Sequence, residues 1–229
     1  MNILFDLDGT LTDPRHGFVA SIKHALTSLG HAAAPEDEIA GHIGPPLQET
    51  LSTLLGENHL HEVEAAISLY RERYTSLGIF ECSVYDGIPQ ALDSLRSSGA
   101  RLLVATSKPH VYAHRILDHF GLSKAFYAVY GSELDGTRTD KRHLVSYLLQ
   151  RESIPAASAL MIGDRAQDVS AAKANGLPSV GVLWGYGSRE ELETAGASAV
   201  LTDPDGLVNL LSSNSLFQGV SCFTGEHRV

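Results

Sequence analysis

Five short apolar runs, separated by segments with helical spacing, constrain the fold of this chain more than any other feature. Each run is bounded by Gly, Asp or Ser, and strands that are buried on both faces of a parallel sheet have this continuous apolar character. The runs are residues 3–5, 101–105, 128–130, 159–162 and 180–183. Because helical segments alternate with them, the sequence predicts an α/β fold with a Rossmann-like parallel sheet as its core.

A long insertion separates the first run from the second. Almost a hundred residues lie between them, far more than a strand–helix–strand crossover needs. Apolar residues there recur at helical spacing and predict three or four helices. We expect an α-helical cap over residues 15–81, an α/β core over 1–14 and 82–212, and a loosely held C-terminal tail over 213–229.

The charge balance and the cysteines bear on partners and location. The chain has 17 Lys and Arg against 27 Asp and Glu, a formal charge of -10, and no basic cluster, so we expect no nucleic-acid partner. It has no export signal and no apolar run long enough to span a bilayer, so we expect no membrane association. Cys82 and Cys222 lie far apart, without metal or disulfide spacing, which favours a cytoplasmic location. The oligomeric state is not indicated.

Two aspartates, Asp6 and Asp8, directly follow the first apolar run. Strand periodicity places both on the same side at the carboxyl end of the strand, where open α/β sheets bind ligands. The alternatives are a solvated turn and a calcium-binding loop. A calcium loop needs more oxygen ligands and a closing Glu within about a dozen residues, and after Asp8 only Asp13 is near. The local sequence therefore excludes the calcium loop.

Further polar residues follow the other runs. Asp164 ends the run at 159–162, and Asp168 comes four residues later, where a helix should begin. Thr106 and Ser107 end the run at 101–105, and Lys141 opens another helix. Each of these polar residues alone commonly has only a structural role, because Asp and Ser are frequent at strand ends and helix caps. Their joint occurrence in this order indicates that they share one polar crevice.

With these residues in this order, the chain resembles the haloacid dehalogenase superfamily, in its phosphoglycolate-phosphatase-like branch with a helical cap. The four superfamily motifs match Asp6-Leu7-Asp8-Gly9-Thr10, then Thr106, then Lys141, then Gly163-Asp164 with Asp168. The insertion lies where this branch carries its cap, and the resemblance extends to about Leu211. It implies a phosphatase that hydrolyses a small phosphorylated metabolite, phosphoglycolate-like or a 5′-nucleotide, through an aspartyl-phosphate intermediate.

The resemblance implies a role for each residue at the phosphoryl group. Asp6 would be the nucleophile, and Asp8 the general acid that protonates the leaving oxygen and later activates water. A carboxylate that attacks phosphorus splits one hard displacement into two easier ones, and a neighbouring acid must supply the proton. Spacing alone does not decide which acid does which. Lys141, the Thr106 hydroxyl and the Ser107 N–H would bind the phosphoryl oxygens.

The resemblance also implies a magnesium ion. The clustered acids would repel a phosphate ester, which carries about two more negative charges, so the site requires a cation. By the family pattern the Asp6 carboxylate, the Asp8 backbone carbonyl and Asp164 would hold Mg²⁺. Asp168 would either bind the ion or support its ligands.

Substrate selection is expected in the cap, within the loop at residues 41–47. Gly44 and Pro45 give this loop a sharp path, and the resemblance places such a loop over the active site; a plain turn between helices is the alternative. His42 would contact substrate or lie exposed in the turn. Arg165 would meet a second anionic group or pair with local acids. Residues 139–143 lack the prolines usual in phosphoglycolate phosphatases. Together with residues 163–165 and 185–188, this loop resembles proteins called 5′-nucleotidases or broad small-metabolite phosphatases, and the sequence does not choose between them.

Two other functions remain as alternatives. A phosphotransferase or mutase on the same scaffold would pass the phosphoryl group to a second hydroxyl instead of water. A non-catalytic binding protein would keep the fold and lose turnover, and the intact Asp6, Asp8, Lys141 and Asp164 argue against it. Dehalogenation is disfavoured, because that branch lacks an acid at the position of Asp8.

Overall fold

A parallel sheet forms the centre of the protein. The computed structural model describes residues 1–209, and within them six strands lie in the order β5-β4-β1-β6-β7-β8, with every neighbouring pair parallel. The strands are β1 (Asn2–Phe5), β4 (Arg101–Pro109), β5 (Ala128–Ser132), β6 (Ala159–Gly163), β7 (Ser179–Val182) and β8 (Ala199–Leu201). All five predicted runs are strands, and the Rossmann-like α/β core is confirmed. The short edge strand β8 was not predicted.

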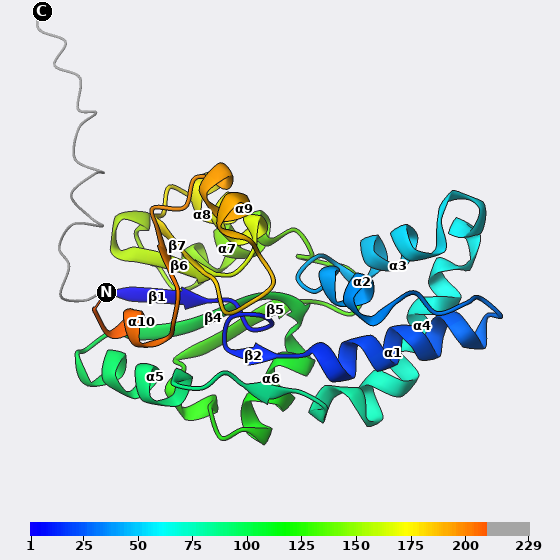
Figure 1. The fold of residues 1–229 in the computed structure, drawn as a ribbon. Coiled ribbons are helices and arrows are strands. Elements are labelled where there is room, and N and C mark those ends of the chain that lie inside the picture. The colour runs from blue at the N-terminus through cyan, green and yellow to red at the C-terminus, as the bar shows by residue number, and fades with distance from the viewer. Residues whose placement is uncertain (210–229) are drawn as a thin grey trace, which may run out of the picture.

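Helices cover both faces of the sheet (Figure 1). They are α5 (Ile88–Ser97), α6 (His110–His119), α7 (Lys141–Arg151), α8 (Ala166–Ala174), α9 (Arg189–Ala195) and α10 (Asp205–Asn209), with the 3₁₀ turns η3 (Ser123–Ala125) and η4 (Ala156–Ser158). Side chains alternate along β1: Ile3 and Phe5 share one hydrophobic cluster with residues of α5 and α6, whereas Leu4 lies in a second cluster with residues of α7 and α8. Burial on both faces accounts for the continuous apolar character of the strands.

A helical region extends from the sheet on the side of the carboxyl end of β1 (Figure 1). Its elements are α1 (Arg15–Ser28), α2 (Glu36–Gly41), α3 (Leu47–Leu55), η1 (Glu57–Glu62), α4 (Val63–Ser76) and η2 (Gly78–Phe80). These agree with the predicted three or four helices. The division into a cap at 15–81 and a core at 1–14 and 82–212 stays a prediction, and the tail at 213–229 lies outside the described residues.

A two-stranded antiparallel sheet joins the two parts, and the sequence analysis missed it. It pairs β2 (Thr12–Asp13) with β3 (Ser83–Val84), so the chain enters and leaves the helical region at adjacent positions. Such short strands carry no periodic signal. Among residues 1–209, the structure contains no helix with the length and apolar character needed to cross a membrane.

Candidate active site

The polar residues predicted to share a crevice follow neighbouring central strands. Phe5, at the end of β1, pairs with Val104 of β4 on one side and Ile162 of β6 on the other. The chain that follows β1 turns at Gly9, which has a φ of 86°. A Cβ at Gly9 would lie 2.2 Å from Asp164 Oδ2, so only glycine allows this close approach. The sheet and this turn bring the first and fourth motifs together.

Lys141 joins two of the buried carboxylates. Its Nζ lies 2.8 Å from Asp6 Oδ1 and 2.6 Å from Asp168 Oδ1, and all three side chains are about 5% exposed or less. Although burial alone would lower it, the charges of Asp168 and Asp6 raise the pKa of Lys141 above its ordinary value. Asp168 also accepts the Arg165 N–H at the start of α8, at 3.0 Å. Lys141 is therefore a fixed cation beside Asp6.

The acids are buried close enough to bind one cation. Carboxylate oxygens of Asp6, Asp164 and Asp168 lie within 4.8 Å of one another. Burial, followed by the charges of Asp168 and Asp6, raises the pKa of Asp164 to about 8. Burial also raises the pKa of Asp168 to about 6, against the opposing charge of Lys141. Keeping these groups ionised without a counterion is unfavourable, and hard oxygen ligands of this kind suit Mg²⁺.

The hydrogen bonds distinguish the acids from one another. Asp164 and Asp168 each accept two protein donors, but one of the donors to Asp168 is the cationic Lys141 Nζ, whereas both donors to Asp164 are neutral. Oδ1 of Asp6 and of Asp8 are buried and accept no hydrogen bond from the described residues, although Asp6 Oδ1 has the Lys141 ion pair. A buried oxygen that accepts no hydrogen bond raises the free energy of the folded protein unless a cation or a substrate binds it. These carboxylates therefore fit a divalent cation bound at Asp6 better than one bound at Asp168.

Asp8 has a cationic partner that the sequence analysis did not assign. Lys108, at the end of β4, places its Nζ 2.8 Å from Asp8 Oδ2 and donates to the Tyr74 hydroxyl of α4. Burial raises the pKa of Asp8, and the Lys108 charge opposes the rise. Lys108 lies two residues after Thr106 and was visible in the sequence, but its contacts with Asp8 and α4 depend on how the helices pack.

Thr106 and Ser107, which the sequence analysis predicts to bind the phosphoryl group, follow the central strand pairing of β4 with β1. Thr106 is 2% exposed, and its hydroxyl accepts the Lys108 N–H at 3.3 Å. The hydroxyl proton therefore remains available for a ligand. The Ser107 carbonyl accepts the Ser132 hydroxyl at 2.8 Å, which ties the loop to β5. Both residues line the same cavity as Asp6 and Asp8.

The cavity over these residues has two chemically different ends. Its volume is about 350 Å³. We call the side formed by the core its floor; the floor residues are Asp6, Asp8, Thr106, Ser107 and Lys108. We call the side formed by the helical region its roof; the roof residues are Phe18, Ile43, Gly44, Pro45, Pro46, Leu47, Gln48, Glu64, Ile67, Tyr70, Arg71 and Tyr74. Tyr70 and Tyr74 stack with ring centroids 5.1 Å apart. The roof is therefore largely apolar and aromatic.

The four residues predicted to set specificity divide into two pairs. Gly44 and Pro45 line the cavity, whereas His42 and Arg165 are not among the described residues that line it. Arg165 Nε donates to Glu191 Oε1 at 2.9 Å, and its Nη1 donates to the carbonyls of Ile43 and Gly41. Arg165 thus contacts the backbone of the cap loop from the core side.

Comparison with known proteins agrees with this arrangement. The family model described as haloacid dehalogenase-like hydrolase matches residues 3–182. A 5′-nucleotidase from Pseudomonas aeruginosa is 44% identical over 213 residues, which are 93% of this chain and 96% of that protein. A crystal structure of a predicted phosphatase from Clostridium acetobutylicum has a TM-score of 0.88 and 39% identity, covering 92% of this chain and 97% of that one.

Two further relatives carry other names. The tyrosine-protein kinase PtkA of Mycobacterium tuberculosis is 42% identical over 200 residues, 86% of this chain and 67% of PtkA. A phosphoglycolate phosphatase from Colwellia psychrerythraea is 27% identical over 201 residues, 85% of this chain and 89% of that protein. The relatives therefore share phosphoryl chemistry and differ in the molecules that their names specify.

Proposed function

The chain belongs to the haloacid dehalogenase-like hydrolases as a phosphatase of that family, and from this premise we propose that it is a magnesium-dependent phosphomonoesterase for nucleoside 5′-monophosphates. The observation that carries the proposal is the cavity, in which an acidic floor with Lys108 and Thr106 faces an aromatic roof. A cytoplasmic location and the absence of nucleic-acid and membrane partners stay predictions from the sequence.

The size of the cavity supports a substrate larger than a two-carbon acid. A volume of about 350 Å³ lies in the range of pockets that enclose drug-sized ligands. With the phosphate at the floor, the leaving group would extend along Phe18 and Tyr70 toward the cap loop. Flat aromatic bases stack favourably on such side chains. Phosphoglycolate would leave most of this apolar surface uncovered.

The charges along the cavity support an uncharged leaving group. Its acidic lining residues beyond the floor are Glu64, Glu133 and Asp135, and its basic ones are Arg71 and Lys108. Lys108 is paired with Asp8, and Glu133 with Arg138. Arg71 donates to the neutral Leu134 carbonyl and keeps its charge. A second carboxylate, as in phosphoglycolate, would therefore meet two remaining acids, Glu64 and Asp135, against one cation. A nucleoside carries no such charge.

The reaction proceeds in two displacements. Asp6 attacks phosphorus, the bond to the leaving oxygen breaks, and Asp8 donates a proton to that oxygen. Water then attacks the aspartyl-phosphate, Asp8 takes its proton, and Asp6 is regenerated with release of phosphate. Lys108 orients Asp8 in both steps, and Lys141 with Thr106 binds the phosphoryl oxygens.

Magnesium completes this site in our proposal. The Asp6 carboxylate, Asp164 and the Asp8 backbone carbonyl would hold Mg²⁺, which neutralises charge on the phosphoryl group as the displacement proceeds. Asp168, which is already paired with the cationic Lys141, would hold that lysine in place.

A phosphotransferase is the second candidate, and the similarity to PtkA favours it. In that case an acceptor hydroxyl replaces water in the second displacement. The two candidates differ in their products, because transfer leaves the phosphate esterified and hydrolysis releases it.

Phosphate release by the purified protein tests the proposal. Substrates are purine and pyrimidine 5′-monophosphates, phosphoglycolate, a sugar phosphate and pyrophosphate, each with Mg²⁺ or with chelator, and the control protein is Asp6→Asn. We expect Mg²⁺-dependent release that is fastest with the nucleotides. Preference for phosphoglycolate would overturn the substrate class, and release unaffected by chelator would overturn the metal. Transfer from ATP to a tyrosine peptide without phosphate release would support the second candidate.

A further inference from the structure

Two histidines and a glutamate meet at the end of the helical region that lies far from the sheet. His31 follows the end of α1, just after Leu29 and Gly30, and His59 and Glu62 belong to η1, directly before α4. Figure 1 shows that α1 runs away from the sheet toward this end. The cluster is therefore separate from the cavity, and none of its residues lines it.

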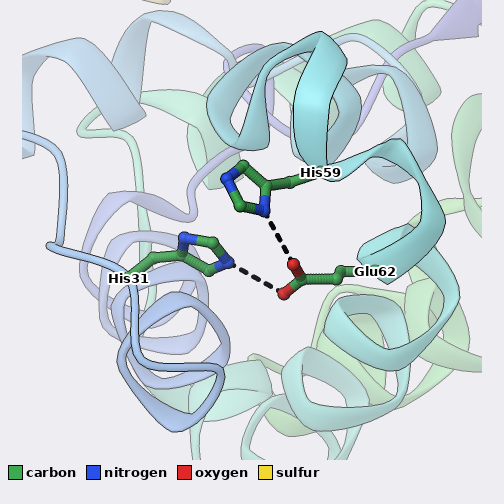
Figure 2. A group of neighbouring side chains, drawn as sticks. All are labelled: His31, His59 and Glu62. Atoms are coloured by element: carbon green, nitrogen blue, oxygen red, sulfur yellow. Dashed lines mark hydrogen bonds and ion pairs between the residues drawn. The ribbon is translucent and has the colours of Figure 1, made fainter.

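The three side chains converge on one point (Figure 2). His31 Nε2 lies 2.8 Å from Glu62 Oε2, and His59 Nδ1 lies 2.7 Å from Glu62 Oε1. The two rings approach edge to face, with centroids 4.6 Å apart. One ligand atom from each residue can be chosen so that all lie within 4.8 Å of one another. The side chains of His31, His59 and Glu62 are 24%, 44% and 22% exposed, so solvent and ions can reach them.

We propose that His31, His59 and Glu62 form a binding site for a divalent transition-metal ion, with zinc as the best match. Two imidazole nitrogens and one carboxylate are a common zinc donor set, whereas Mg²⁺ and Ca²⁺ prefer oxygen ligands alone. Each ring nitrogen that now faces Glu62 would bind the ion after losing its hydrogen bond to the carboxylate.

The distances require only a small adjustment. Nitrogen and oxygen ligands lie about 2.0–2.2 Å from zinc, so two ligands at a tetrahedral angle are about 3.4 Å apart. The nitrogen–oxygen pairs now at 2.7 and 2.8 Å would open by about 0.6–0.7 Å to admit the ion. The other pairs of ligand atoms, which lie within 4.8 Å of one another, would close by at most about 1.4 Å. His61 is 76% exposed, with its Nε2 3.6 Å from Glu62 Oε1, and rotation of its side chain would supply a fourth ligand in place of water.

A metal here would act on the helical region and not on the phosphoryl group. It would tie the end of α1 to the start of α4, two helices that pack along each other and carry the roof residues Phe18, Tyr70 and Tyr74. The simpler account is a hydrogen-bonded histidine–glutamate cluster without metal. The two differ in whether zinc is bound by the folded protein, which is measurable without any variant.

Calorimetric titration of zinc into tag-free, metal-stripped protein tests the site, with excess Mg²⁺ present to occupy the acidic floor. We expect one equivalent to bind and, at a free concentration about 100-fold above Kd, to raise Tm by about 5–10 °C. Co²⁺ should give the visible absorption of a four-coordinate site with nitrogen ligands. No zinc binding by the folded wild-type protein, or binding without the Co²⁺ absorption, would overturn the proposal.

Variants locate the bound ion. His59→Ala and Glu62→Gln should each weaken zinc binding at least about tenfold, and phosphate release should be unchanged. His16→Ala, an exposed histidine on α1, is the matched control and should bind zinc as the wild type does. Equal zinc affinity in His59→Ala, Glu62→Gln and wild type would place the ion elsewhere and overturn the site. This result is independent of the nucleotide proposal.

Discussion

The floor and the roof of the cavity are built in opposite ways. The floor carries its charges on side chains at strand ends, held by the ion pairs of Asp6 with Lys141 and of Asp8 with Lys108. The roof presents rings and prolines from the helical region, and its loop is held through backbone carbonyls that Arg165 contacts. A side chain in the floor has specific charged partners, whereas one in the roof mainly provides surface.

This difference separates the chemistry from the choice of substrate. Charges fixed before the substrate arrives stabilise a transition state without reorganisation. Apolar surface adds binding energy in proportion to the area covered. Floor substitutions should therefore lower kcat for every substrate, and roof substitutions should change KM for some substrates more than for others. The four predictions below test this separation, from the largest effect to the smallest.

Asp6→Asn should give the largest loss. Without a nucleophilic carboxylate no aspartyl-phosphate forms, and we expect kcat to fall at least about 10⁴-fold with all substrates. Phosphate release measures the activity, and circular dichroism checks that the fold is retained. If the folded variant had activity close to that of the wild type, Asp6 would not be the nucleophile.

Lys141→Met should cause the second largest loss of kcat. The substitution removes the fixed cation beside the floor residue Asp6 and leaves Asp168 without its ion-pair partner, so we expect kcat to fall about 10²–10³-fold. The matched control is Lys124→Met, which changes an exposed lysine in η3 and should leave kcat unchanged. A loss seen only as a higher KM would assign Lys141 to binding alone.

Phe18→Ala should affect substrates unequally. Phe18 lines the roof and packs edge to face on Tyr70. Loss of its contact surface, worth about 1.4 kcal/mol, should raise KM for a nucleoside monophosphate about tenfold, with less than about a twofold change for phosphoglycolate. Phe18→Leu should give an intermediate value. Equal changes for both substrates would contradict the role of the roof in selection.

Arg165→Gln should have the smallest effect. Its guanidinium holds the cap loop without lining the cavity, and loss of about 1 kcal/mol of hydrogen bonding should raise KM about three- to tenfold at constant kcat. Arg189→Gln, which removes an exposed ion pair with Glu193 in α9, is the matched control and should change neither constant. A fall in kcat with unchanged KM would place Arg165 in the chemistry instead.

Local patterns in the sequence were sufficient for five of the six described strands of the main sheet and for the polar residues that follow them. The apolar runs predicted five strands, because burial on both faces demands continuous apolar sequence. Parallel strands end at one edge, so residues after them, such as Asp6, Thr106 and Asp164, had to lie close together. Neither inference needed to know how distant segments pack. The three-residue strand β8 and the pairing of β2 with β3 were too short to leave a pattern.

The sequence alone therefore determined the α/β core, the helical insertion and the residues at the strand ends, since each follows from periodicity along the chain. Only the tertiary structure decided which residues meet across the cavity and within the helical region. The contacts of Lys108 with Asp8 and Tyr74, of Arg165 with the loop carbonyls, and of His31 with Glu62 join residues 31 to 124 positions apart. Such contacts depend on how whole helices pack, and no local spacing encodes that packing.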